Sequence, residues 1–287
     1  MIMDRKGNVL QDDTVQDKTL TFLYNNFFGR ILLKLLCRRF ISNLGRMYMN
    51  SRFSKKRINK LIKSENIDMT QYEQRSFSSF NDFFTRKILE GKRSIDNSPE
   101  ALISPADSKL TVYDISEDSV YSIKGCDYST KQLLMDKDLA KEFAGGKCLI
   151  YRLTVDNYHR YCHIDNGTEL SRRFIKGILH TVNPIALVKH DVYGKNCREL
   201  TLFQTENFGR VAYIEIGAMM VGRINNYPAA DKVQKGEEKG YFSFGGSTIA
   251  VLYKKDTVII DKDISENSKK DIETTVLYGE RVGTKKI

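Results

Sequence analysis

The chain has 287 residues, 46 lysines and arginines against 36 aspartates and glutamates, and a formal net charge of +10. It is long enough to bury a large core, and no apolar stretch approaches the roughly 18 to 20 residues that a membrane-spanning helix needs. Its five cysteines are scattered and form no CxxC pair, which favours reduced thiols inside the cell over a disulfide framework or a zinc site.

Residues 1–17 form the first segment. They include Asp4, Asp12 and Asp13 and contain no apolar core, so they do not have the pattern of a secretion signal. We expect a flexible N-terminus here.

Residues 18–64 carry almost all of the excess charge. They contain 12 lysines or arginines and no acidic residue, which leaves 34 basic and 36 acidic residues in the remainder. Apolar residues recur mostly at three- and four-residue spacing from 22 to 41, and Arg30, Lys34 and Arg38 form a polar stripe. The pattern predicts a basic amphipathic helix, with a second basic helix over 52–63.

Such helices have two favoured locations. They can lie on an anionic membrane surface, or they can pack on the protein's own core with a basic face in solvent. Nucleic acid is the competing acidic partner, but no recognition motif is present, so no nucleic acid is expected. We expect residues 18–98 to form a helical, membrane-associating region, including a short helix over 77–87 that begins with serine capping residues.

The sequence pattern changes after a linker over residues 91–100. Short apolar runs bounded by Gly, Asn or Asp predict strands at 110–113, 148–154, 200–204, 211–216, 249–252 and 258–260. A helix is expected over 130–143. The fold class is therefore α+β, with N-terminal basic amphipathic helices followed by a β-rich catalytic domain over 99–287.

The tetrapeptide Gly245-Gly246-Ser247-Thr248 precedes one of these predicted strands. It is either an ordinary glycine turn or a place where a hydroxyl group lies beside an unshielded peptide carbonyl and can attack it. The local sequence alone favours the turn.

Three other residues have side chains suited to catalysis. His159 and His163 lie four apart, but the HExxH pattern is absent and the segment follows a predicted strand, so a general base is favoured over a metal ligand and no metal is expected. Asp107 is a carboxylate in a turn after Pro105.

Together these residues and their flanks resemble the phosphatidylserine decarboxylase family. The resemblance covers most of the chain from about Phe77 to Tyr253. It rests on SFNDFFTRK at 79–87, SPAD at 104–107, DNYHR at 156–160, GILHTVNP at 177–184, ENFG at 206–209, IGAMMVG at 216–222 and GYFSFGGST at 240–248.

The resemblance implies a self-processing proenzyme. Ser247 would attack the Gly246 carbonyl, and elimination from the resulting ester would leave a covalent pyruvoyl group at position 247. The products would be a β chain, 1–246, and an α chain, 247–287, which stay associated. The pyruvoyl group would form a Schiff base with phosphatidylserine, and loss of carbon dioxide would give phosphatidylethanolamine without a metal.

The resemblance also implies an Asp-His-Ser triad for self-cleavage, but the chain departs from that pattern. The family's second histidine, two residues after the arginine of DYHR, is Cys162 here, and His163 is displaced by one position. The base is therefore His163, which we prefer, or His159 acting twice, or Cys162 as a substitute. His180 is expected near the site.

Two alternative functions remain to be compared with this interpretation. A serine hydrolase with the same Asp-His-Ser set would need the GxSxG elbow, but position 249 is Ile. A non-enzymatic basic lipid-binding module would use the glycine pair only as a turn. We expect a peripheral protein on the cytoplasmic face of the cell membrane; whether it is a homodimer stays open.

Overall fold

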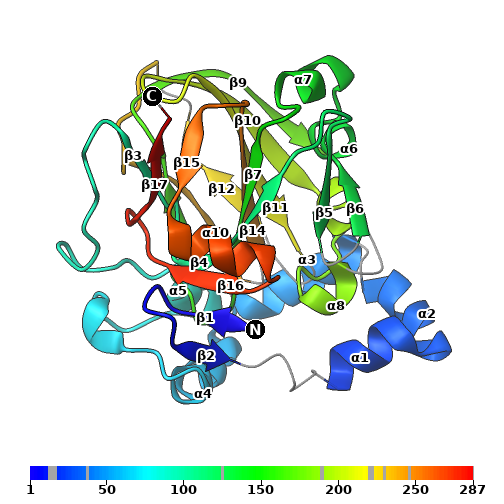
Figure 1. Cartoon of the computed structure of the whole chain (residues 1–287). Helices are drawn as coiled ribbons and strands as arrows, with labels where there is room; N and C mark the ends of the chain where they lie inside the picture. The colour runs from blue at the N-terminus through cyan, green and yellow to red at the C-terminus, as the bar shows by residue number, and fades with distance from the viewer. Residues whose placement is uncertain are drawn as a thin grey trace.

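The computed structural model describes residues 1–11, 18–36, 39–123, 126–187, 191–218, 223–228, 231–244 and 247–286. Helices dominate the N-terminal part and strands the remainder, which confirms the predicted α+β class (Figure 1).

The N-terminal region contains short helices instead of one long amphipathic helix. They are α1 (Lys18–Asn25), α2 (Phe27–Leu36), α3 (Arg39–Met49), η1 (Arg52–Arg57), α4 (Ile58–Ser64), η2 (Met69–Gln71) and α5 (Phe80–Phe84). Between α1 and α2, the Asn26 side chain accepts hydrogen bonds from the backbone of Phe28 (2.9 Å) and Gly29 (3.4 Å). An asparagine that binds the next turn's amides starts a new helix, so the continuous helix predicted over 22–41 was wrong at this position. Cys37 and Arg38 lie outside the described residues.

The short helix α5 confirms the prediction over 77–87. The Ser79 hydroxyl accepts a hydrogen bond from the backbone of Asp82 at 3.1 Å, which is the N-cap that the sequence indicated.

A nine-stranded sheet forms the centre of the molecule. Its strands are β1 (Ile2–Met3), β2 (Val9–Gln11), β4 (Ser108–Asp114), β7 (Lys147–Leu153), β9 (Gly167–Ile175), β10 (Arg198–Thr205), β11 (Arg210–Gly217), β14 (Ser247–Tyr253) and β16 (Glu273–Val276). Their order is β2-β1-β16-β4-β7-β14-β11-β10-β9, so β14 is an interior strand between β7 and β11.

Smaller sheets and helices cover the large sheet. One sheet contains β12 (Ile224–Asn226), β13 (Glu238–Phe242) and β8 (Arg160–Cys162); a second contains β15 (Val258–Ile260), β17 (Arg281–Lys285) and β3 (Ala101–Ile103); a third pairs β5 (Val120–Ile123) with β6 (Cys126–Ser129). The remaining helices are α6 (Thr130–Leu134), α7 (Lys137–Glu142), α8 (Pro184–Leu187), α9 (Val192–Lys195) and α10 (Lys262–Lys269). The helix predicted over 130–143 is thus two helices.

The faces of β14 belong to two separate cores. Ala250 and Leu252 belong to the core that contains residues of α6, α7 and α9, whereas Ile249 and Val251 belong to the core that contains residues of β8, β13 and α10. Side chains alternate along a strand, so Ser247 points to the same side as Ile249. The serine of the tetrapeptide therefore faces the three-stranded sheet of β8, β12 and β13.

Residues 1–11 contribute two short strands to the large sheet. β1 pairs in parallel with β16, with Ile2 opposite Glu273, and β2 pairs with β1. The Arg5 guanidinium bonds Asp263 (2.7 Å) and Asp261 (2.8 Å). Residues 12–17 lie outside the described residues.

Arg5 is expected to stabilise this arrangement. Arg5→Met would leave the carboxylates of Asp261, Asp263 and Glu280 without their shared cation, which should lower the free energy of unfolding by about 1–3 kcal/mol. Urea unfolding in a Ser247→Ala background, where the chain should stay continuous, measures this. The exposed Lys6→Met is the control and should shift stability by less than about 0.5 kcal/mol; equal effects of both variants would contradict the assignment.

Candidate active site

Ser247 lies in the interior of the protein. Register places it opposite Gly217 of β11 and Leu153 of β7, and it is 0% exposed. Its hydroxyl oxygen has no hydrogen-bond partner among the described residues. Gly245 and Gly246 lie outside the described residues. A buried hydroxyl without a partner costs stability, so its presence here needs an explanation.

His159 is also buried and holds one defined tautomer. Its Nδ1 lies 2.9 Å from the backbone oxygen of Asn157. A carbonyl oxygen only accepts, so Nδ1 carries the hydrogen and Nε2 presents a lone pair. Nε2 has no partner in the described part of the chain. Burial lowers the pKa of His159 to about 3, so the imidazole is neutral.

Aromatic contacts connect His159 to the segment that precedes Ser247. Its ring packs on Phe84 with centroids 3.9 Å apart, and Phe84 contacts Phe244 at 5.2 Å. The backbone of Phe242 donates a hydrogen bond to the His159 carbonyl at 2.9 Å. His159 therefore belongs to the same cluster as the residues leading into the glycine pair.

His163 packs elsewhere. Its ring contacts Phe203 of β10 at 5.7 Å, and Phe203 pairs with Val211. Burial, helped by the positive charges of Lys239 and Arg172, lowers the pKa of His163 to about 3.

Cys162 is held as a thiol. It is fully buried with Sγ 4.0 Å from the Ser104 carbonyl oxygen. Burial raises its pKa to about 12, because a thiolate loses its hydration there. The side chain that occupies the family's histidine position is therefore a poor base at neutral pH.

Asp107 has other partners than a histidine. The Arg93 guanidinium binds both of its oxygens, at 2.8 and 2.5 Å, and the backbone of Tyr278 donates to Oδ1 at 2.8 Å. No hydrogen bond joins Asp107 to His159 or His163 among the described contacts. The Asp-His pair implied by the family pattern is not formed in this structure.

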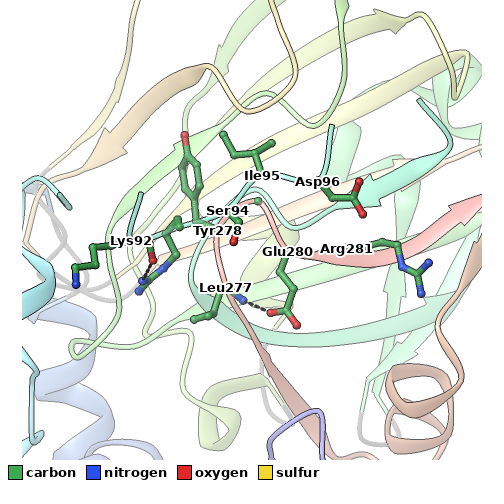
Figure 2. A pocket seen from close by; sticks show the side chains of 10 residues that line it. Lys92, Ser94, Ile95, Asp96, Leu277, Tyr278, Glu280 and Arg281 are labelled. Atoms are coloured by element: carbon green, nitrogen blue, oxygen red, sulfur yellow. Dashed lines mark hydrogen bonds between the residues drawn. The ribbon is translucent and has the colours of Figure 1, made fainter. Parts of the chain in front are cut away.

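A pocket of about 330 Å³ adjoins this ion pair. It is lined by residues 92–96 and by the turn between β16 and β17, residues 277–281 (Figure 2). Arg93 and Tyr278, the two partners of Asp107, both belong to its lining. Sequence reasoning missed both, since nothing in the local pattern connects positions so far apart in the chain.

His180 is connected to the neighbourhood of Ser247 through Asn196. The Asn196 amide nitrogen donates to the carbonyls of His180 and Gly217, both at 2.8 Å, and its oxygen accepts from the His180 backbone at 2.9 Å. The His180 ring lies 3.2 Å from the Tyr24 hydroxyl of α1. A polar network thus runs from α1 to the residue opposite Ser247.

Within the described ranges, no group of three or more His, Cys, Asp or Glu residues could hold a metal ion. In the same part of the chain, no helix has both the length and the hydropathy to cross a bilayer.

Comparison with known proteins decides the family. The model of the phosphatidylserine decarboxylase family matches residues 80–284. The chain belongs to this family. The phosphatidylserine decarboxylase proenzyme 2 of Clostridium acetobutylicum is 49% identical over 92% of this chain and 91% of its own length. The proenzymes of Clostridium botulinum and Clostridium perfringens are each 42% identical, over 94% and 93% of both chains respectively.

Membership confirms the resemblance that the motifs indicated. Phosphatidylserine decarboxylases are carboxy-lyases, and the relatives named above are proenzymes. The matched residues include Asp107, His159 and Ser247 and extend almost to the C-terminus.

Proposed function

We propose that this chain is a self-processing phosphatidylserine decarboxylase whose pyruvoyl group arises from Ser247. One observation carries the proposal: in a member of this family, the serine of the glycine-serine motif is fully buried at the start of an interior strand with an unpartnered hydroxyl.

The surroundings of Ser247 fit a pyruvoyl group. Strands β7 and β11 fix the backbone of position 247 from both sides, and Gly217 adds no side chain opposite it. The group supplies an electron sink for the charge released when carbon dioxide leaves phosphatidylserine. The protein supplies a water-excluded site and neutral His159, whose Nε2 is available to exchange a proton.

Association of the two chains after cleavage follows from strand pairing. The α chain would contain β14 between β7 and β11, β16 between β1 and β4, and β17 beside β3. Each of these partners belongs to the β chain, so cutting one peptide bond removes none of the described strand pairs.

Of the three residues that the sequence offers as a base, geometry places His159 in the aromatic cluster that leads to Ser247, which differs from the sequence-based preference for His163. His159 shares the aromatic cluster of Phe84 and Phe244, whereas His163 contacts Phe203 of β10. Cys162 is a buried thiol with a raised pKa.

The N-terminal helices provide a surface suited to an anionic membrane. Large apolar side chains remain exposed on them, with exposed fractions of 65% for Phe27, 72% for Phe28 and 69% for Phe53. Exposed cations, including Arg30 and Lys34, lie on the same helices. Apolar insertion together with basic charge is how peripheral helices bind the cytoplasmic leaflet, where the lipid substrate resides.

The origin of the pyruvoyl group has a direct test. Ser247→Ala should remain one 33.1 kDa chain without decarboxylase activity, because no hydroxyl can attack. The unmodified protein should give two chains, with mass spectrometry showing a pyruvoyl-blocked residue at the start of the smaller one, and borohydride should inactivate it. An active, uncleaved wild-type chain would refute the proposal.

The three residues that the sequence offers as bases can be compared by substitution. His159→Ala should slow self-cleavage more than either of the other two substitutions, because only its ring packs in the aromatic cluster that leads to Ser247. His163→Ala and Cys162→Ala should cleave within a few-fold of wild type. Timed cell-free synthesis followed by gel electrophoresis measures the rates, and the reverse ranking would sink this assignment.

Membrane association can be tested separately from self-cleavage. Phe27→Glu with Phe28→Glu should weaken binding to vesicles of phosphatidylserine and phosphatidylcholine by about tenfold or more, since each buried phenylalanine contributes about 1.5–3 kcal/mol. Self-cleavage should be unchanged. Phe174→Glu, on the exposed face of β9, is the matched control at 52% exposure. Sedimentation that is equally weak for both variants would count against the surface.

A further inference from the structure

Glu215 and Lys239 form an ion pair sealed inside the protein. The Lys239 ammonium donates to Oε1 of Glu215 at 2.6 Å, and the side chains are 0% and 1% exposed respectively. The other carboxylate oxygen, Oε2, has no partner in the described part of the chain. A buried carboxylate with a free oxygen costs stability, and nothing in the fold described above makes use of it.

Strand register puts Glu215 and Ser247 on the same face of adjacent strands, with no hydrogen bond between their side chains in this structure. Glu215 of β11 lies opposite Ile249, and Gly217 lies opposite Ser247. Since Ser247 and Ile249 point to the same face, Ser247 and Glu215 are diagonal neighbours on it. Diagonal neighbours are about 7–8 Å apart at the backbone, within reach of a long side chain such as glutamate. Gly217 adds no side chain between them.

Two buried, unpartnered polar atoms thus share one face of adjacent strands: a hydroxyl that can donate and a carboxylate oxygen that can only accept. We propose that the Glu215 carboxylate accepts the hydroxyl proton of Ser247 and so activates it for attack on the Gly246 carbonyl. The inference rests on the proposed self-processing of this chain and names a base outside the expected aspartate, histidine and cysteine candidates.

Burial favours a carboxylate over an imidazole as the acceptor. Protonation creates a charge on histidine, so desolvation lowers the pKa of His159 to about 3 and makes it a weak base. Protonation removes a charge from glutamate, so desolvation raises the pKa of Glu215 and makes it a stronger base than in water. Lys239 favours the ionised form that has to accept the proton.

The step balances without any co-reactant. The proton moves from Ser247 Oγ to Glu215 Oε2 while Oγ bonds to the Gly246 carbonyl carbon. The peptide bond between Gly246 and Ser247 then breaks, and the carboxyl proton passes to the amide nitrogen of residue 247. The product is an ester isomer of the chain, and the carboxylate is regenerated for the elimination that follows.

The groups around Glu215 determine how the test is built. Lys239 lies 5.1 Å from the centre of the Tyr213 ring, and Glu199 is the cross-strand partner of Glu215 on β10. Removing Glu215 alone leaves Lys239 as an unpaired buried charge, which is strongly destabilising, whereas replacing both charges is often tolerated. The variants are therefore Glu215→Gln and the double change Glu215→Gln with Lys239→Met.

Self-cleavage during timed cell-free synthesis, read on a gel as the appearance of the α chain, is the measurement. Both variants should cleave at least about 100-fold more slowly than wild type. The matched control Glu199→Gln removes a neighbouring carboxylate one strand farther from Ser247 and should cleave at the wild-type rate. A double variant with a wild-type melting temperature but no cleavage supports the proposal; one that cleaves normally overturns it.

Hydroxylamine separates this step from later ones, because it cuts an ester but not a peptide bond. Wild-type proenzyme should release its α chain faster in hydroxylamine, whereas the uncleaved Glu215 variants should not respond, because their ester has not formed. Hydroxylamine-dependent cleavage of those variants would overturn the proposal. If wild type itself stays uncleaved under all conditions, the proposed function fails, and that result is distinct from both outcomes.

Discussion

The rest of the structure depends on the pairing of β14 along both of its edges. Seven residues from Ser247 to Tyr253 pair with β7, six of them also pair with β11, and all seven are buried. This pairing satisfies the backbone groups, so the strand can run through the buried centre of the protein. It also fixes where the hydroxyl of Ser247 points, because register determines the face. The site is thus a consequence of strand pairing.

Desolvation then decides which side chains can act as bases. The same burial that keeps His159 neutral and holds Cys162 as a thiol raises the pKa of Glu215. Side chains that would titrate near neutral pH in water therefore lose their advantage in this interior. Residue type alone ranks histidine first as a base. Burial in this interior lowers the pKa of His159 and raises that of Glu215.

Local signals were sufficient for much of the fold. The serine cap at Ser79 and the apolar runs of β7, β11 and β14 predicted their elements, because caps and strand patterns act over a few neighbouring residues. The break at Asn26 and the N-terminal strand β1 were not predicted, since β1 has two residues and depends on β16 at the other end of the chain. In the site, family motifs pointed to Ser247 and His159. The sequence did not reveal the ion pairs of Arg93 with Asp107 and of Lys239 with Glu215. Their members are 14 and 24 residues apart in the chain, and only tertiary packing brings them together.

The strands of residues 247–287 pair with strands of residues 1–246, and this affects how long a processed molecule would stay folded. Cutting before Ser247 leaves an α chain of 41 residues, 247 to 287, near the size below which a chain rarely folds alone. Its strands are interleaved with those of the β chain, and β16 is enclosed by β1 and β4. Unfolding would therefore release a fragment that cannot refold by itself and must find its partner by diffusion. The lifetime of such a molecule is set by the barrier to opening rather than by an equilibrium between folded and unfolded chains.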